Sequence, residues 1–211
     1  MIDEVKIFQE LEDGTSVFMD DIYYVATIFT KRYAPDGLGV LDIRQKVEEW
    51  ARKHNIFILN DINLVINRFI SRRMSLTTGM TASITRRDIN YIADHVTTMG
   101  RRRVLFALMV YGKVYHDEIG NFRLPVKTFA RWMKYADPSN LYTRHFPWLI
   151  QNNFMEDVTK NYEVRGYTMD DGVLIFKMSS LLIEDRTPVV LEITDNDVMG
   201  AFEKIDWKKR Y

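Results

Sequence analysis

The sequence predicts a mainly helical α+β protein, and three observations lead to that fold class. The first is an uninterrupted apolar and aromatic run, residues 104–111, which follows the basic triplet Arg101–Arg103. The second is a pair of helical segments further along, separated by a turn at residues 136–139. The third is helical periodicity in the first hundred residues, which is strongest at residues 62–70, where apolar side chains recur at three- and four-residue steps.

The N-terminal part, residues 1–80, is expected to form a helical subdomain. Its predicted helices span residues 22–33, 41–54 and 61–71. Asp20 or Asp21 is expected to cap the first of them and Asn60 the last, because such side chains accept hydrogen bonds from free backbone N–H groups. Residues 2–19 fit either a hairpin or a short helix.

A second part, residues 85–180, contains the most informative pattern. Its first expected elements are a helix from Thr85, with Asp88 in capping-box position, and the helix that contains residues 104–111. A helix from Pro125, the turn and a helix at residues 141–150 follow. The last element is a hairpin that pairs residues 154–165 with 173–178. This order is that of a winged helix-turn-helix. The uncharged residues 74–84 are interpreted as a linker or a wing-like loop.

The helix at residues 141–150 is the candidate for reading DNA bases. Leu141, Phe146, Leu149 and Ile150 are expected to face inward, which leaves an outward set of Asn140, Tyr142, Thr143, Arg144 and Gln151. Asn and Arg side chains suit the edges of adenine and guanine in the major groove. Pro147 is expected to kink or restart this helix, because it removes one backbone hydrogen bond. The alternative is an ordinary solvent-facing helix with no ligand.

Basic side chains around this helix are the candidates for holding phosphates. They are Lys127, Arg131, Lys134, Arg101, Arg102, Arg103, Lys160 and Arg165. Asp170 and Asp171, near the predicted tip of the hairpin, would repel a phosphate. The triplet Arg101–Arg103 opens a helix, where the helix dipole disfavours cations, so either acidic neighbours or a bound phosphate should offset its charge. A solvated turn is the alternative.

Charge is unevenly distributed along a chain that is neutral as a whole. The sequence has 29 basic and 29 acidic residues, but residues 101–165 hold 11 basic against 6 acidic, a local excess of +5. This distribution is compatible with a localised nucleic-acid interface and argues against a protein that coats nucleic acid along its whole surface.

The C-terminal part, residues 181–211, is expected to add a strand at residues 189–193 and a helix at residues 197–205 that Asp195 or Asn196 caps. The basic and aromatic residues at the end of the sequence fit either a nucleic-acid contact or a frayed terminus.

Several classes of function lack their sequence signatures. The chain has no cysteine, which excludes disulfides and thiolate chemistry. We find no phosphate-binding glycine loop, dinucleotide fingerprint or nucleophile elbow. The one histidine–carboxylate cluster, residues 116–118, fits a solvated loop better than a metal site. We therefore expect no catalytic residues, no metal and no cofactor. No apolar run approaches the length of a membrane span and no signal peptide is recognisable, so we expect a cytoplasmic protein.

The central pattern resembles the winged-helix domains of phage and mobile-element proteins. The residues that carry the resemblance are Arg103–Lys113, Gly120–Leu124 and Leu149–Glu156, with a closing phrase of Leu149, Ile150, Asn152, Asn153 and Phe154. Proteins of this kind are replication organisers, initiators and transcription regulators. The resemblance implies binding to double-stranded DNA, in replication initiation or in transcription regulation, in the cytoplasm of the host cell.

A second hypothesis is a non-enzymatic protein-interaction module that docks a replication, transcription or host-defence protein. Zero net charge favours it. Residues 1–80 fit a second, degenerate winged helix as well as a plain helical subdomain. A homodimer is compatible with either hypothesis, and the sequence does not determine the stoichiometry.

Overall fold

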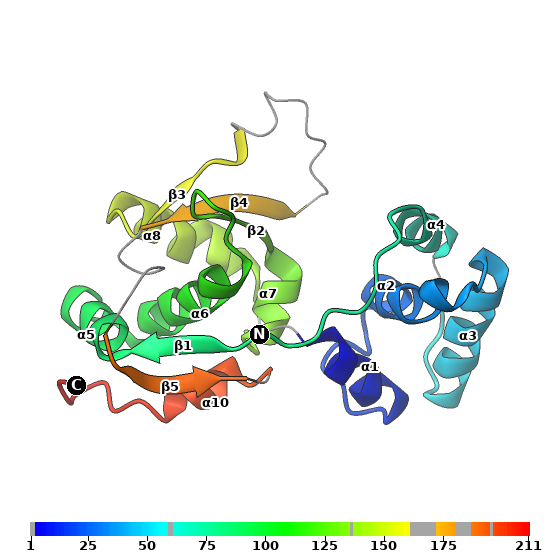
Figure 1. The fold of residues 1–211 in the computed structure, drawn as a ribbon, viewed down its shortest axis with the longest axis horizontal. Coiled ribbons are helices and arrows are strands. Elements are labelled where there is room, and N and C mark those ends of the chain that lie inside the picture. Colours follow the sequence, from blue (N-terminus) through cyan, green and yellow to red (C-terminus); the bar gives the residue numbers. More distant parts are fainter. Residues whose placement is uncertain (1–2, 59–60, 136, 161–171, 180–186, 195) are drawn as a thin grey trace. The chain divides into compact units, whose positions relative to one another are not determined.

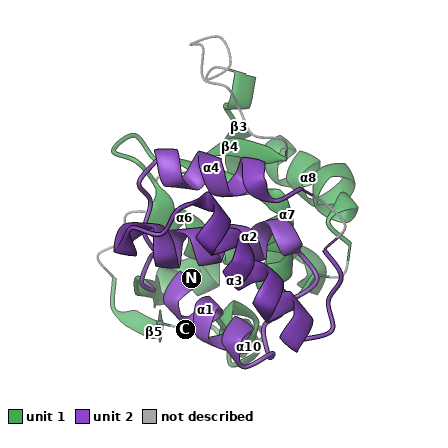
Figure 2. Cartoon of the chain, turned by 90° about the vertical axis from the view of Figure 1, so that its right-hand side faces the viewer, with its two compact units in different colours: residues 1, 80–211 green, residues 2–79 purple. Residues whose placement is uncertain are grey.

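The computed structural model of the chain describes residues 3–58, 61–135, 137–160, 172–179, 187–194 and 196–211. It is a mixed α+β structure in which helices predominate and two small antiparallel sheets occur (Figure 1). The chain divides into two compact units, residues 2–79 and residues 80–211, which Figure 2 colours separately. Among the described residues, no helix combines the length and the apolar character that crossing a bilayer requires.

The unit of residues 2–79 is helical. Its elements are α1 (Glu4–Glu12), α2 (Ile22–Tyr33), the short 3₁₀ helix η1 (Ala34–Asp36), α3 (Val40–Lys53) and α4 (Asn63–Ser71). Residues 4–12 thus form the short helix, not the hairpin, and the carboxylate of Asp3 caps it by accepting a hydrogen bond from the Lys6 N–H at 3.0 Å. Asp21 caps α2, as predicted. The predicted cap Asn60 lies outside the described residues.

Buried polar contacts hold this helical unit together. The indole N–H of Trp50 donates to the Leu11 carbonyl at 2.7 Å, which ties α3 to the end of α1. Lys31 and Glu4 form a buried ion pair of 2.6 Å, and the second Glu4 oxygen accepts a hydrogen bond from the Thr77 N–H at 3.0 Å. The extended segment after α4 is therefore attached to the same unit as α1 and α2.

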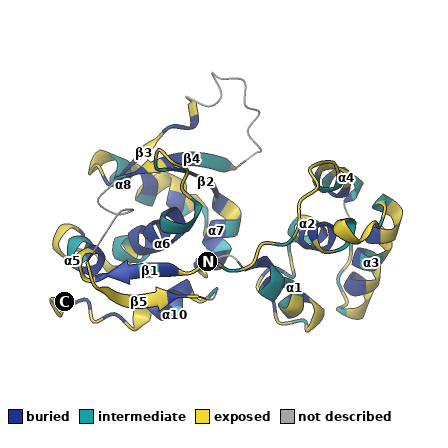
Figure 3. Ribbon diagram, viewed as in Figure 1, coloured by how far each residue is buried: buried dark blue, intermediate teal, exposed yellow. Residues whose placement is uncertain are grey.

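The unit of residues 80–211 is built around α6. Its helices are α5 (Arg86–His95), α6 (Met99–Tyr115), α7 (Val126–Trp132), the π-helical turn η2 (Leu141–His145), α8 (Phe146–Gln151) and α10 (Val198–Glu203). Every residue of α6 from Val104 to Tyr111 is buried, and Figure 3 shows part of this helix in the colour of buried residues and part in that of intermediate ones. In Figure 1, α6 runs between the two sheets.

One sheet has the strand order β2-β4-β3, formed by β2 (Asn121–Pro125), β4 (Val173–Met178) and β3 (Met155–Asp157). Both pairings are antiparallel. Strand β4 lies in the centre, and its Phe176 is opposite Phe122 of β2 on one side and Asp157 of β3 on the other. The ring of Phe176 also contacts Phe146 at 5.1 Å between centroids, which attaches α8 to this sheet.

The second sheet corrects one prediction. Residues 74–84 were expected to be a linker or loop, but β1 (Ala82–Thr85) pairs antiparallel with β5 (Val189–Ile193). Strand 189–193 itself was predicted. The capping box of Thr85 and Asp88 is also confirmed at the start of α5. The pairing places residues after 186 in the same compact unit as residues 80–179, although they were predicted to be a separate part.

The last residues of the chain pack against α5. Asn90 makes two hydrogen bonds with the backbone of Tyr211, at 2.8 and 3.0 Å, and Arg210 lies 3.3 Å from Asp94. This segment is therefore not frayed, although the side chains of Lys208, Lys209 and Arg210 are exposed. Asp197 caps α10, whereas Asp195 or Asn196 was predicted to do so.

Candidate nucleic-acid interface

Helix α7 packs one side against α6, and the segment formed by η2 and α8 packs one side against β4. Phe129 and Trp132 of α7 make edge-on contacts with Tyr111 of α6, at 5.9 and 6.1 Å between ring centroids. Leu141 and Leu149 are fully buried, as predicted. Burial of these apolar side chains fixes the rotation of the segment, and the polar side chains between them are consequently directed to solvent.

Pro147 divides the predicted single helix into two. Residues Leu141–His145 form the π-helical turn η2, in which the Phe146 N–H donates to the Leu141 carbonyl five residues back. Pro147 then lies in the first turn of α8, where the absence of its N–H costs little. The wider turn accommodates the proline without ending the segment. Such π turns occur frequently at functional sites.

The predicted base-contacting residues fall into two groups. Asn140 donates from its amide to Asp137 at 2.8 Å, and the Thr143 hydroxyl donates to the Ser139 carbonyl at 3.0 Å. These groups are engaged within the turn that precedes η2. Hydrogen bonds from Ser139 hold the pKa of Asp137 below its usual range, so this carboxylate remains charged. One of the two amide N–H donors of Asn140 is therefore engaged, which restrains the orientation of its side chain.

Arg144 and Tyr142 belong to the second group. Arg144 is exposed and makes no hydrogen bond or ion pair with any described residue. Tyr142 is 40% exposed, and its ring meets Phe146 edge-on at 6.0 Å. Its hydroxyl lies beside Gly172, 3.8 Å from the position that a Cβ would occupy there. Burial raises the pKa of Tyr142, so the phenol keeps its proton and is able to donate a hydrogen bond.

Arg101 lies in the first turn of α6 and stacks on an aromatic side chain of α8. Its guanidinium is 4.3 Å from the centre of the Trp148 ring, and Trp148 in turn stacks on Phe154 at 5.5 Å. This stacking holds the side chain in one orientation. The sequence interpretation did not include Trp148. In the sequence, the only sign of a role for Trp148 was its position one helical turn after Arg144.

The other two arginines of the triplet have structural contacts, which corrects their grouping with Arg101. Arg102 donates to the carbonyls of Val96 at 2.5 Å and Ala93 at 3.0 Å, both at the end of α5. These carbonyls have no partner within their own helix, and their partial negative charge attracts a cation. Arg103 lies over the Phe202 ring and 4.0 Å from Glu203. Backbone carbonyls surround the charge of Arg102, and one carboxylate lies near that of Arg103.

The remaining predicted phosphate ligands also differ in their surroundings. Lys127 and Lys160 are exposed and make no ion pair or hydrogen bond within the part of the chain that the structure describes. Lys127 follows β2, whose last residue pairs with Val173, and Lys160 follows Val158, whose N–H donates to Ile175. Both lysines therefore lie toward the same end of β4.

Two further candidates are less available, and a third is not among the described residues. Lys134 is paired with Asp197 at 3.2 Å. Arg131 is half-buried on α7. Arg165, together with Asp170 and Asp171 of the predicted wing tip, lies outside the described residues.

His145 of η2 is affected by the charges of both Arg101 and Arg144. Its Nε2 atom is 2.7 Å from the Tyr135 hydroxyl. Burial lowers the pKa of His145, and the positive charges of Arg101 and Arg144 lower it further. The first turn of α6 lies beside this imidazole, since a Cβ at Gly100 would be 3.9 Å from its Cε1 atom. The sequence analysis did not single out this histidine.

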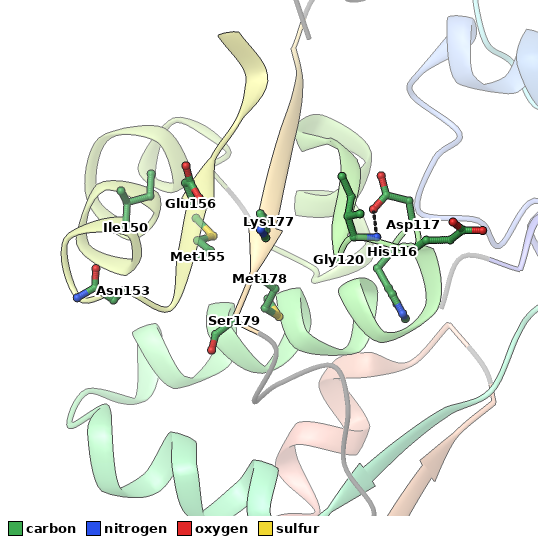
Figure 4. Close-up of a pocket in the computed structure, with 12 residues that line it drawn as sticks. His116, Asp117, Gly120, Ile150, Asn153, Met155, Glu156, Lys177, Met178 and Ser179 are labelled. Carbon is green, nitrogen blue, oxygen red and sulfur yellow. Dashed lines mark hydrogen bonds between the residues drawn. The ribbon is translucent and has the colours of Figure 1, made fainter. Parts of the chain in front are cut away.

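A separate cleft of about 790 Å³ lies at the opposite end of β4 from Val173 (Figure 4). It is lined by the loop of His116–Gly120 and by residues of α8, β3 and β4, including Glu156 and Lys177. Asp117 accepts hydrogen bonds from the N–H groups of Ile119 and Asn121, so its carboxylate shapes the loop. Among the described residues, no three His, Asp or Glu side chains are grouped as metal ligands.

Comparisons with protein-family models, with curated proteins and with solved structures found no match for this chain.

Proposed function

We propose that residues 99–178 form a winged helix-turn-helix and that this unit binds double-stranded DNA. The element order from α6 to β4 and the strand order β2-β4-β3 support this proposal. In such a unit, η2 and α8 are the recognition helix, and β3 and β4 flank the wing. The observation that carries the proposal is Arg144, an exposed and unpaired side chain in the N-terminal half of that helix.

Four cations have the exposure or orientation that phosphate binding needs. They are Arg101, Lys127, Arg144 and Lys160. Each phosphate contact releases counterions, so the affinity falls with salt at a slope of about −0.9 per contact. If all four contact phosphates, the affinity should fall roughly 150-fold between about 50 and about 200 mM salt.

The test is a titration of the purified chain with random-sequence duplex DNA across that range of salt. A steep decline supports the DNA-binding proposal, and the slope counts the contacts. Absence of binding even at low salt would refute it. On this proposal the protein is not an enzyme, and its setting is replication initiation or transcription regulation of a phage or mobile element. Its location would be the host cytoplasm.

A protein-docking function has separate support in residues 2–79. Leu41, Phe57 and Leu64 are 77%, 89% and 76% exposed, which is unusual for large apolar side chains on one small unit. They favour a partner such as a replication, transcription or host-defence protein. A pull-down with residues 2–79 intact, repeated with Leu41 and Leu64 changed to Ser, tests this second candidate.

A further inference from the structure

Arg101 differs from its two neighbours because it has an aromatic support but no partner for its N–H groups. Its guanidinium lies 4.3 Å from the centre of the Trp148 ring, and it makes no hydrogen bond or ion pair with any residue that the structure describes. Arg102, by contrast, is bonded to backbone carbonyls, and Arg103 lies near Glu203. The N–H donors of a guanidinium lie in its plane, so a guanidinium that is stacked on a ring still directs its donors outward.

The aromatic support under Arg101 is itself fixed in place. Trp148 stacks on Phe154, with 5.5 Å between the ring centroids and 27° between the ring planes. Phe154 is 3% exposed and meets Tyr91 of α5 edge-on at 5.8 Å. Aromatic side chains of α8, α5 and the segment before β3 thus form one row, and Arg101 lies over its Trp148 end. Such a row limits the positions that the guanidinium can take.

The Arg101 side chain lies beside the proposed recognition helix. Trp148 belongs to α8, and the first turn of α6 lies against His145 of η2, as described above. The start of a helix carries partial positive charge, which disfavours an unpaired cation there, and a bound anion would offset both charges. Holding a long side chain in one position also costs conformational entropy, and that order contributes to affinity only when a ligand binds the positioned group.

We propose that Arg101 binds one backbone phosphate of duplex DNA through two N–H groups, and that Trp148 is the positioning residue that holds the guanidinium for this contact. The inference rests on the proposed function and adds to it a residue, Trp148, and a contact geometry. A planar guanidinium binds phosphate oxygens through two parallel N–H···O bonds, and both form only when its plane is correctly oriented. The Trp148 ring orients that plane before DNA arrives, so less rotational freedom is lost on binding.

The first test compares variants of Arg101 in binding to random-sequence duplex DNA from about 50 to about 200 mM salt. Lysine keeps the charge but lacks the planar pair of donors, so Arg101→Lys should leave the salt slope unchanged. It should bind about 2- to 10-fold more weakly, as expected for the loss of one hydrogen bond. Arg101→Met removes the charge as well and should reduce the slope by about 0.9. Wild-type affinity in Arg101→Lys would overturn the inference.

Arg103→Lys is the matched control for this exchange. Arg103 lies in the same turn of α6 and over an aromatic ring, that of Phe202 at 5.8 Å, but it has Glu203 beside it. Arg103→Lys should therefore bind DNA as tightly as the wild type. Equal weakening by Arg103→Lys and Arg101→Lys would show that the exchange acts without a contact specific to Arg101, and would overturn the inference.

The second test concerns Trp148. Trp148→Leu should weaken binding about 2- to 30-fold, the range that corresponds to one cation–π contact, and Trp148→Phe, which keeps an aromatic face, should recover most of the affinity. In a chain that already carries Arg101→Met, Trp148→Leu should have no further effect, because Trp148 acts through Arg101. A purely structural role for Trp148 would weaken binding equally in both backgrounds, and that result would overturn the inference.

The wild-type chain separates this inference from the proposed function. If the wild type does not bind duplex DNA at low salt, the proposed function fails and the inference fails with it. If the wild type binds and the Arg101 and Trp148 variants bind equally well, only the inference fails and DNA binding stands.

Discussion

Replacing Arg102 is predicted to lower stability without weakening DNA binding, whereas replacing Arg144 should weaken DNA binding without lowering stability. The contrast tests whether Arg102 is a structural residue and Arg144 a DNA-contacting one. Arg102→Met removes hydrogen bonds to the carbonyls of Val96 and Ala93 and a longer one, of 3.4 Å, to the carbonyl of Trp207. Hydrogen bonds to charged groups contribute about 1.5–3 kcal/mol each, but water can reach this half-buried site and replace part of the loss. We therefore expect the free energy of unfolding to fall by about 2–4 kcal/mol. Arg144→Met removes an exposed side chain, so stability should change by no more than about 0.5 kcal/mol.

The assay combines urea unfolding, followed by circular dichroism, with DNA binding at low salt. Arg144→Met should weaken binding by about 1–3 kcal/mol and relax any sequence preference. Arg102→Met should leave the affinity of the folded fraction unchanged. Arg102→Lys keeps the charge but lacks the planar group that reaches two carbonyls, so it should recover only part of the stability. If Arg102→Met instead weakened binding without loss of stability, the assignment of Arg102 to the end of α5 would be wrong.

Two further predictions concern the same unit. Asp88 is buried and pairs with Lys113 at 2.7 Å, so Asp88→Ala leaves the Lys113 ammonium group without its carboxylate. The free energy of unfolding, measured in urea, should fall by about 3–5 kcal/mol. An unchanged unfolding midpoint would show that Lys113 reaches solvent instead. Asp137→Ala removes an exposed negative charge beside Arg144 and frees the amide of Asn140. It should tighten binding to random duplex about 1.5- to 5-fold, the range expected for exposed charge pairs, and weaker binding would count against the location of the interface.

Local patterns in the sequence predicted those features that depend on neighbouring residues. The burial of Val104–Tyr111 followed from an apolar run with no polar face, and the capping box of Thr85 and Asp88 followed from spacing alone. The strand at residues 189–193 was similarly evident. Each of these features is determined within a few residues of chain, where propensity and periodicity act directly.

Features that depend on distant residues could not be predicted in this way. Strand β1 is four residues long and its partner β5 lies more than a hundred residues later, so nothing near Ala82 indicates the pairing. Arg102 resembled its two neighbours in sequence, and only the end of α5 distinguishes it. The position of His145 beside the start of α6 likewise requires that α6 and η2 pack together.

The contacts around η2 limit how such an interface would discriminate between sequences. Direct base reading needs free donors and acceptors in the right orientation, but one amide N–H of Asn140 is bonded to Asp137 and the hydroxyl hydrogen of Thr143 to the Ser139 carbonyl, which restrains both side chains. Arg144 remains, and its proposed role at a phosphate competes with a role at guanine. Because phosphate contacts carry no direct sequence information, we expect affinity to come mainly from the cations and selectivity to be modest. A neutral chain whose positive charge is concentrated in one segment is consistent with such a protein, provided that residues 2–79 or a second copy adds the missing specificity.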